Sequence, residues 1–373
     1  MGFKVPFVDL PLHHQKLEKE FMEVIKDVLF NRADIIMRSD LKEFEEKVAE
    51  FIGTQYAIGL NSGTDAIFLS LLSAGVGKGD EVITVAHTFP ATVAAIVFTG
   101  ATPILVDIGK DYNMNTDLLE EAITSKTKAI IPVHLNGRIC NMEKIMSIVG
   151  ENSLIVIEDA CQAWGAAFNG KKAGSIGLTG CFSLYPFKVL GGIGDGGILT
   201  TNSKEIADKI SLLRDHCANR KTGEFLGFGY NSRLDNFNAA ILNIKIKYLP
   251  RWVERRREVA RFYHEGLKDL NRILLPPPPD SDSQYFDVFQ NYVIRSNERE
   301  RLISYLAENG VETLISWPIP LHHQRDLNLG HFNLPVTERI SKEVVSLPIN
   351  TEISEKQVEY VIQTVRNFFN KAR

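Results

Sequence analysis

The chain has 373 residues, of which 44% are hydrophobic and 24% are charged. This is the composition of an ordinary soluble globular protein, and the length predicts about two domains with a large core. The formal net charge of −4 provides no general attraction to nucleic acid or to an anionic membrane surface, so neither is expected as a partner.

Cysteine usage and the N-terminal sequence predict a cytoplasmic protein. The four cysteines form no CxxC pair and show no metal-ligand spacing with histidines, so we expect reduced thiols and no metal site. The N-terminus has no positively charged lead followed by an apolar segment, so no signal peptide is expected. The most apolar long window, residues 91–106, is too short to span a bilayer and is interrupted by Gly100 and Pro103.

Two amphipathic helices are predicted first along the chain. Apolar residues from Leu17 to Val28 share one helical face, and a second helix is predicted over Asp40–Ile52, ended by Gly53. Short apolar runs then alternate with helix-length segments, which is typical of an α/β layered domain with a mostly parallel sheet. The predicted strands are Tyr56–Leu60, Glu81–Val85, Ile104–Ile108, Ala129–Leu135, Leu154–Glu158, Cys181–Leu184 and Gly197–Thr200. The last two lie closer together, which favours an antiparallel or edge arrangement.

Helical periodicity dominates from Leu234 to Leu267, where Pro250 is expected to kink or break the helix. Later predicted elements are a strand over Phe289–Ile294, a helix over Asn297–Asn309 and a final helix over Ser354–Ala372. We therefore expect a large domain over residues 1–245 and a smaller C-terminal domain over residues 246–373.

One lysine stands out between an apolar strand and a glycine-rich segment. Lys188 follows a run that ends at Pro186 and precedes five glycines within residues 191–197. An amine beside a backbone that can bend closely around it suggests a lysine that serves a bound molecule. The alternative is a surface lysine next to a hairpin turn. Residues 192–197 formally match GxGxxG, but they precede a strand, whereas a nucleotide-binding fingerprint follows a strand and opens a helix.

The strand-to-helix turn NSGTDA at residues 61–66 suits a phosphate group. Its small residues leave backbone N–H groups and the positive end of the helix free to meet an anion. The alternative is an ordinary N-cap, in which Ser62 or Thr64 satisfies the first turn of the helix.

Two carboxylates, Glu158 and Asp159, end a buried strand at the edge where ligands of open α/β sheets bind. A buried carboxylate is costly without a partner, so an aspartate here could pair with a protonated ring nitrogen. Gln162 could then bond a neighbouring ring substituent. The alternative is that the aspartate caps the next helix.

Phe89 and His134 also stand at strand ends. Phe89 could offer a flat face to a stacked ring or could belong to the core, and His134 could be a satisfied core histidine. A phosphate turn, a stacking face, a carboxylate, a glutamine and a lysine in one domain together match one cofactor, pyridoxal 5′-phosphate. The lysine would hold this cofactor as a Schiff base.

Over most of its length the sequence resembles the nucleotide-sugar aminotransferases of the DegT/DnrJ/EryC1/StrS type. The matching segments, in the order of that family, are EFEEKVAEFIG, SGTDAIFLSL, GDEVITVAHTFPAT, GATPILVDI, TKAIIPVHLNG, VIEDACQAWGA, GCFSLYPFKVLGGIGDGGILTTN, GYNSRLDNFNAAIL, PIPLHHQ and SLPI. The resemblance implies the fold-type I architecture of aspartate aminotransferase, with a large domain built on a mostly parallel mixed sheet and a smaller α+β domain. It also implies a homodimer whose active sites are shared between the subunits.

The resemblance further implies roles for individual residues, motif by motif. Lys188 would form the Schiff base, and Asp159 would pair with the pyridine nitrogen of the cofactor. The other cofactor contacts would be Gln162 at the ring oxygen, Phe89 stacked on the ring, Gly63, Thr64 and Ser183 at the phosphate, and Asn231 contributed to the phosphate by the partner subunit. Tyr185, Arg233 and His322 would border the sugar-nucleotide site.

The implied activity is transfer of an amino group from L-glutamate to a keto group on a UDP- or dTDP-linked hexose. The product would be an amino sugar for surface polysaccharide, such as lipopolysaccharide, or for natural-product glycosylation. The PIPLHHQ segment favours a 3-keto over a 4-keto sugar. One alternative is a sugar dehydratase using the same cofactor, a branch that tends to lack the lysine; another is a non-catalytic regulator of the same fold. The chain departs from the usual motifs at Asn136, Arg138, Val189, Asn238 and Ser316–Trp317.

Overall fold

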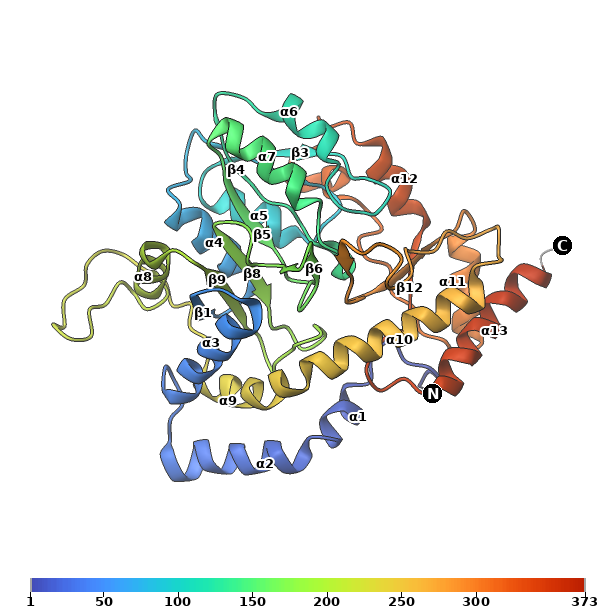
Figure 1. The fold of residues 1–373 in the computed structure, drawn as a ribbon, viewed down its shortest axis with the longest axis horizontal. Coiled ribbons are helices and arrows are strands. Elements are labelled where there is room, and N and C mark those ends of the chain that lie inside the picture. The colour runs from blue at the N-terminus through green and yellow to red at the C-terminus, as the bar shows by residue number, and fades with distance from the viewer. Residues whose placement is uncertain (1, 372–373) are drawn as a thin grey trace.

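The computed structural model describes residues 2–371, and Figure 1 shows a large α/β part joined to a smaller part by the long helix α10. The α-helices are α1 (Leu10–Gln15), α2 (Glu18–Lys26), α3 (Ser39–Ile52), α4 (Gly63–Ser73), α5 (Pro90–Phe98), α6 (Leu119–Ala122), α7 (Met142–Asn152), α8 (Lys204–Leu213), α9 (Asn236–Lys245), α10 (Leu249–Leu267), α11 (Arg299–Glu308), α12 (Pro335–Glu343) and α13 (Glu355–Lys371). A π-helical turn, η1 (Asp27–Arg32), continues α2.

Seven strands form the central sheet in the order β1–β9–β8–β5–β4–β2–β3. They are β1 (Tyr56–Leu60), β2 (Glu81–Val85), β3 (Thr102–Val106), β4 (Thr127–Ile130), β5 (Ile155–Asp159), β8 (Thr179–Ser183) and β9 (Gly197–Thr201). β3, β2, β4, β5 and β8 are parallel to one another, whereas β9 is antiparallel to both of its neighbours. Residues 184–196 contain no helix that could carry the chain back across the sheet, so β9 returns beside β8 in the opposite direction. The predicted mixed, mostly parallel sheet is confirmed.

Both faces of the sheet are buried, and successive strand residues enter different cores. Cys181 packs with α4, α5 and α8 on one face, whereas Phe182 packs with α3, α7 and α9 on the other. Ile198 and Leu199 of β9 alternate in the same way. Since side chains point to opposite faces along a strand, burial of both faces explains why these strands are continuously apolar.

The smaller part is built on a two-stranded antiparallel sheet of β11 (Tyr292–Arg295) and β12 (Val344–Leu347). Its core also contains residues of α10, α11 and α13. The helix α10 belongs to both cores, because Trp252 and Val253 pack into the large one and Val259 and Tyr263 into the small one. The boundary at residues 245 and 246 stays a prediction. A further small sheet contains β6 (Ala167–Phe168), β7 (Lys171–Lys172) and β10 (Tyr285–Phe286).

Several element bounds match the predictions and others are corrected. β1 and β2 have the predicted bounds, but β4 ends at Ile130 rather than at Leu135. Beyond Ile130 the chain still follows β5, with an isolated parallel bridge between Val133 and Asp159, and it turns at Asn136, which adopts a left-handed φ of 57°. The helical region predicted from residue 234 to residue 267 is broken near Pro250, as expected: a 3-10 turn at Ile246–Tyr248 separates α9 from α10, and Pro250 lies in the first turn of α10. Proline is tolerated there because the first N–H groups of a helix have no partner within the helix. The final helix was predicted to reach Ala372, which lies outside the described residues.

Candidate active site

Lys188 lies in the loop between β8 and β9, which two backbone hydrogen bonds close. The N–H of Gly192 donates to the carbonyl of Leu184 over 2.7 Å, and the N–H of Leu184 donates to the carbonyl of Gly196 over 2.8 Å. A side chain at Gly191 would place its Cβ 2.6 Å from the carbonyl oxygen of Tyr185, so the loop requires glycine there. The glycines therefore let the backbone fold tightly behind the lysine.

The Lys188 amine is partly buried beside acidic and thiol groups. Burial lowers the pKa of Lys188, and the neighbouring Cys161 and Asp159 oppose that shift. Burial also raises the pKa of the Cys161 thiol well above its ordinary value, which keeps that thiol neutral. A lysine with a lowered pKa has more of the neutral amine that nucleophilic and base chemistry require. Lys188 is half-buried rather than exposed, although its loop does join two antiparallel strands, so its function stays a prediction.

Asp159 ends β5 with its side chain buried, 5% exposed. One carboxylate oxygen accepts a hydrogen bond from the Thr92 hydroxyl at 2.8 Å, and the other accepts one from the backbone N–H of Cys161 at 3.2 Å. Thr92 is in turn 3.0 Å from the Thr88 hydroxyl. The segment after Asp159 forms turns and not a helix, so the interpretation of this aspartate as a helix cap is wrong.

Glu158, the neighbour of Asp159, has a structural task and is fully buried. Its carboxylate accepts backbone N–H bonds from Gly174 at 2.9 Å and from Ile176 and Gly177 at 2.7 Å. The imidazole Nε2 of His134 lies 2.9 Å from the same carboxylate. His134 is thus a satisfied core histidine, and Glu158 has no capacity left for a ligand.

The predicted phosphate turn lies against the strand that precedes Lys188. Ser62 caps α4 by accepting the N–H of Asp65 at 3.0 Å, and Gly63 begins the helix. A Cβ at Gly63 would lie 2.9 Å from Sγ of Cys161 and 3.1 Å from Cβ of Ser183, so this turn and β8 approach one another closely. Helix starts of this kind, with first-turn N–H groups such as those of Gly63 and Thr64 and the positive end of the helix dipole, are able to bind an anion.

Gln162 and Phe89 are accessible at their strand ends. The side-chain oxygen of Gln162 accepts the backbone N–H of Asn136 at 2.8 Å, which holds the amide in place. Phe89 precedes α5 and is 61% exposed, so the core alternative for this ring is wrong. An aromatic face left this open can be covered by a planar ring.

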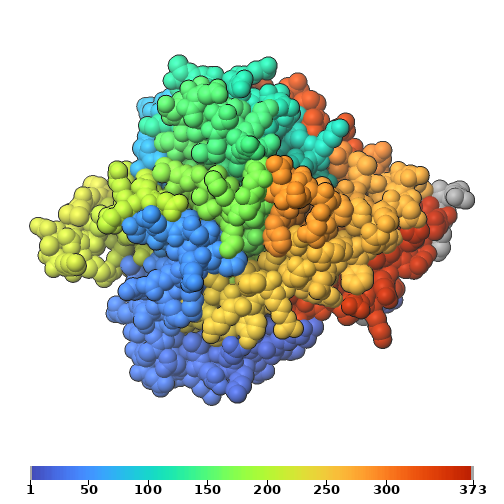
Figure 2. Space-filling view, viewed as in Figure 1, coloured from blue at the N-terminus to red at the C-terminus, as the bar shows by residue number. Residues whose placement is uncertain are grey.

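Asn231 and Arg233 make their contacts with Asp215, whereas the N–H of Tyr185 donates to the Ser183 hydroxyl at 3.3 Å. Arg233 pairs with Asp215 at 3.2 Å, and Asn231 forms an isolated bridge with the same residue. Asn231 ends an arm, residues 215–231, that projects from the large part, as Figures 1 and 2 show, and Arg233 follows two residues later. Tyr185 is 47% exposed. The backbone carbonyl of Tyr185 accepts the N–H of Lys188 at 2.9 Å, whereas no hydrogen bond or ion pair of Asn231 or Arg233 within the described residues reaches Lys188 or Asp159.

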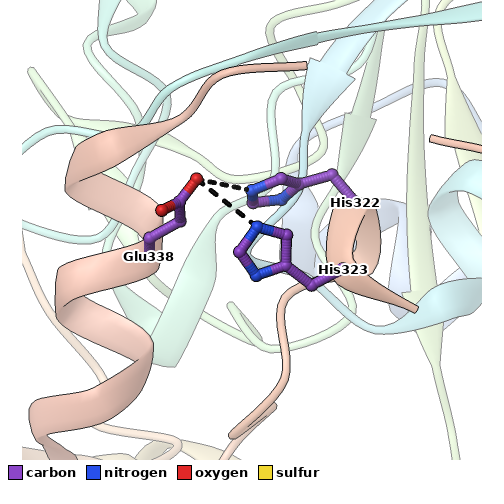
Figure 3. A group of neighbouring side chains, drawn as sticks. All are labelled: His322, His323 and Glu338. Carbon is purple, nitrogen blue, oxygen red and sulfur yellow. Dashed lines mark hydrogen bonds and ion pairs between the residues drawn. The ribbon is translucent and has the colours of Figure 1, made fainter. Parts of the chain in front are cut away.

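His322 is buried and belongs to a small cluster from the C-terminal part, drawn in Figure 3. Its Nε2 lies 3.3 Å from one carboxylate oxygen of Glu338, and Nε2 of His323 lies 3.5 Å from the same oxygen. Burial lowers the pKa of His322, which favours the neutral imidazole, and its Nδ1 is buried without a partner. In the described part of the chain these three side chains are the one group that could hold a metal ion, which the sequence did not predict. One carboxylate oxygen of Glu338 pairs with both imidazoles, so these pairings hold the three side chains together without a metal ion.

The segment that carries His322 folds over the edge of the sheet near Phe89. The N–H of Leu321 donates to the carbonyl of Ala86 at 3.2 Å, and Leu321 packs with Ala86 and Val93 in a separate apolar cluster. His322 is therefore brought from the C-terminal part to the end of β2.

A cavity of about 490 Å³ lies away from these residues, at α1 and α10. Its lining includes Trp252, Arg255 and a charged group in which His13 and Lys16 pair with Glu352. It contains none of the predicted site residues. The strand-end group around Lys188 is the better candidate for chemistry.

The residues at the strand ends fit pyridoxal 5′-phosphate. The close approach of Gly63 to Ser183 leaves a cradle that would suit a phosphate and that a side chain at residue 63 would fill. The buried Asp159 is oriented by Thr92 to meet a cationic nitrogen, and the amine of Lys188 lies in the same group. Thr92 and Cys161 were missed by the sequence reasoning, although both stand in the strand-end segments that carry Phe89 and Asp159. The fold and this donor set define a pyridoxal-phosphate enzyme of fold type I.

Comparison with known proteins gives the family. The sequence profile of the DegT/DnrJ/EryC1/StrS aminotransferase family matches residues 15–366. The chain is 40% identical to the "Pleiotropic regulatory protein" of Geobacillus stearothermophilus over 98% of both chains. It is 42% identical to the dTDP-3-amino-3,6-dideoxy-alpha-D-galactopyranose transaminase of Aneurinibacillus thermoaerophilus, covering 98% of this chain and 99% of that protein.

The fold is similar to that of the S. venezuelae protein DesV, whose crystal structure was solved in complex with a ketimine intermediate. The TM-score is 0.94 at 34% identity, with 99% of each chain covered. The chain belongs to the DegT/DnrJ/EryC1/StrS aminotransferase family, and it is an aminotransferase that depends on pyridoxal 5′-phosphate. No helix within residues 2–371 is both long enough and apolar enough to cross a membrane.

Proposed function

We propose that this aminotransferase transfers an amino group from L-glutamate to a keto group on a UDP- or dTDP-linked hexose. The observation that carries the proposal is the convergence of Lys188, Asp159, and the Gly63–Ser183 cradle at the strand ends. The named transaminase relative from Aneurinibacillus supports a nucleotide-linked sugar as the substrate. The 3-amino group in its name also supports a 3-keto over a 4-keto acceptor.

Two residues would handle the proton movements. When bound, pyridoxal 5′-phosphate supplies an aldehyde that reacts with amines and a ring that withdraws electrons from the reacting carbon. The neutral amine of Lys188 would take the proton from Cα of the amino donor and deliver it to C4′ of the cofactor. The Asp159 carboxylate would keep a proton on the ring nitrogen, and the Thr92 hydroxyl keeps that carboxylate in position.

The remaining residues would bind and orient the cofactor. Gly63 and Thr64 would donate backbone N–H groups to the phosphate, and the Ser183 hydroxyl would add a further hydrogen bond. The amide nitrogen of Gln162 would donate to the ring oxygen while its oxygen stays bonded to Asn136. The exposed ring of Phe89 would cover one face of the cofactor.

We propose a homodimer in which the arm at residues 215–231 enters the partner subunit. The arm carries three exposed apolar side chains, Phe225, Leu226 and a fully exposed Phe228, which a monomer would leave in water. Asn231, at its base, would reach the phosphate of the partner's cofactor. Tyr185, Arg233 and His322 would border the sugar nucleotide.

The cysteines also support an intracellular location for this aminotransferase. All four cysteines are free thiols, which is the state maintained by a reducing compartment. We propose a cytoplasmic location, where the product would supply the synthesis of a surface polysaccharide such as lipopolysaccharide or of a glycosylated natural product.

The substrate is tested by mass spectrometry of products after incubation with glutamate and a panel of 3-keto and 4-keto nucleotide sugars. We expect a product that has gained an amine from a 3-keto sugar. Lys188→Ala should form none and should fail to attach the cofactor covalently, whereas Lys171→Ala, which removes an exposed lysine, should behave like the wild type. Wild-type turnover by Lys188→Ala would refute the proposal.

A regulatory role is the second candidate, because the Geobacillus relative is named for one. It is tested by a gel shift with genomic DNA at physiological salt, set beside an absorbance spectrum with added cofactor. A shift without cofactor absorbance would favour the regulator. Loss of water from a keto sugar without the gain of an amine would instead favour the dehydratase alternative, against which Lys188 argues.

A further inference from the structure

Gln290 binds the backbone on both sides of Lys188. Its side-chain oxygen accepts the N–H of Val189 at 3.0 Å, and its side-chain nitrogen donates to the carbonyl of Phe187 at 3.1 Å. Gln290 is 8% exposed and precedes β11, so it comes from the C-terminal part of the chain. One amide therefore connects the two peptide groups that flank the reactive lysine.

The backbone of Gln290 is itself held from two directions. The guanidinium of Arg256, in α10, donates to the carbonyl oxygens of Phe289 at 3.0 Å and Gln290 at 3.2 Å. From the large part, Gly137 approaches so closely that a Cβ there would lie 2.8 Å from the backbone nitrogens of both residues. Because the backbone of Gln290 is fixed in this way, its side-chain amide can restrain the loop that carries Lys188.

The next residue supports another residue of the site. The side-chain nitrogen of Asn291 donates to the side-chain oxygen of Asn136 at 3.2 Å, and the N–H of Asn136 donates to the Gln162 oxygen at 2.8 Å. Gln290 thus bonds the backbone on both sides of Lys188, and the next residue, Asn291, bonds Asn136, whose N–H in turn bonds Gln162.

We propose that Gln290 is a positioning residue that sets the location of the Lys188 amine relative to the cofactor aldehyde. The proposal rests on the assignment of Lys188 as the cofactor lysine. A lysine side chain has four rotatable bonds, so the place that its amine occupies depends on how firmly its backbone is held. A displacement of about 1 Å in a reacting group can cost on the order of 100-fold in rate.

The restraint needs both a donor and an acceptor on one side chain, and glutamine has both. Gln290→Met keeps the approximate length and removes both hydrogen bonds. Gln290→Glu keeps an acceptor for the Val189 N–H but sets a carboxylate oxygen against the Phe187 carbonyl. Gln284→Met, at an exposed position, is the matched control.

The test compares a ligand that must react with Lys188 with one that need not. The rate at which added pyridoxal 5′-phosphate attaches covalently to the full-length apoprotein is followed by stopped-flow absorbance across pH. The Kd of pyridoxamine 5′-phosphate, which has no aldehyde for the lysine, is measured on the same samples. We expect Gln290→Met and Gln290→Glu to attach the aldehyde at least tenfold more slowly, with an altered pH profile, while their Kd for the amine form stays within twofold.

Two results would overturn the proposal. Attachment within twofold of the wild-type rate in Gln290→Glu would show that the restraint has no role, and an equal loss in the rate and in the affinity would show a general structural defect. If Gln290→Met does not fold, Gln290→Glu alone decides. Covalent attachment that persists in Lys188→Ala would refute the proposed function instead, so the two failures can be told apart.

Discussion

His134 and Glu158 face each other across 2.9 Å with both side chains fully removed from solvent. The same carboxylate accepts three backbone N–H groups of the 174–177 turn. This turn precedes β8, the strand that leads to Ser183 and Lys188. A buried polar pair that makes no proposed contact with the cofactor therefore supports the segment on which the proposed chemistry depends.

Glu158→Gln should destabilise the fold without removing a group that would contact the cofactor. The amide would set N–H groups against the N–H donors that the carboxylate now satisfies, and unpaired buried polar groups are costly. We expect the free energy of unfolding to fall by about 3 kcal/mol, as is typical for breaking a buried charged network. Urea unfolding followed by circular dichroism measures it. The exposed Glu151→Gln should change little, and equal stability of the two variants would contradict the assignment.

Thr92→Val should lower the turnover rate because it weakens the support of the Asp159 carboxylate. It removes the hydroxyl that donates to the buried carboxylate at 2.8 Å and keeps the shape of the side chain. A hydrogen bond to a charged group contributes about 1.5–3 kcal/mol, so we expect a loss of about tenfold or more in kcat/KM.

Thr84→Val is the control for this change. Its hydroxyl is also buried but donates to the backbone carbonyl of Ile131 at 3.0 Å, away from Asp159. The control should lose about 1 kcal/mol of stability and keep its kcat/KM. Steady-state kinetics beside urea unfolding separate the two variants, and full activity of Thr92→Val would refute the role of the hydroxyl.

His87 should make the protein less stable as the pH falls. Burial lowers its pKa from 6.5 to about 4 in the folded state. Above pH 6.5 both states are neutral, whereas between pH 6.5 and 4 the unfolded chain binds a proton that the folded chain does not. The free energy of unfolding should drop by about 3 kcal/mol across that window because of this residue.

The pH effect is measured by urea unfolding of His87→Gln and the wild type at several pH values. The difference in stability between them should shrink as the pH falls from 6.5 to 4, because only the wild type loses this contribution. His331→Gln, which removes an exposed histidine, should parallel the wild type. A constant difference for His87→Gln would show that His87 does not stay neutral.

Phe228→Asp should break the proposed dimer. Phe228 is fully exposed on the projecting arm, and burial of a phenylalanine side chain stabilises an interface by about 1.5–3 kcal/mol. We expect a shift towards the monomer in sedimentation velocity, with at least a tenfold rise in the dimer Kd. Phe262→Asp, on α10 and 43% exposed, is the control and should leave the assembly unchanged. A wild type that is monomeric at micromolar concentration would refute the proposed dimer.

The sequence alone predicted the α/β sheet and the lysine around which the site is built. Strands such as β1 and β2 could be bounded correctly because buried apolar runs end at polar turns, which is a local signal. Lys188 was recognisable for a similar reason, since the glycines that let the loop fold lie next to it in the chain. The family resemblance extended the prediction to residues in other motifs.

The tertiary structure decided what those residues contact. The sequence treated Glu158 and Asp159 as a pair, but alternation along β5 turns one into the core and leaves the other beside Thr92. Thr92 lies 67 residues before Asp159, and Gln290 lies 101 residues after Val189. Hydrogen bonds between residues so far apart leave no periodicity or spacing in the sequence, because only the packing of the sheet and of the two parts brings their atoms together.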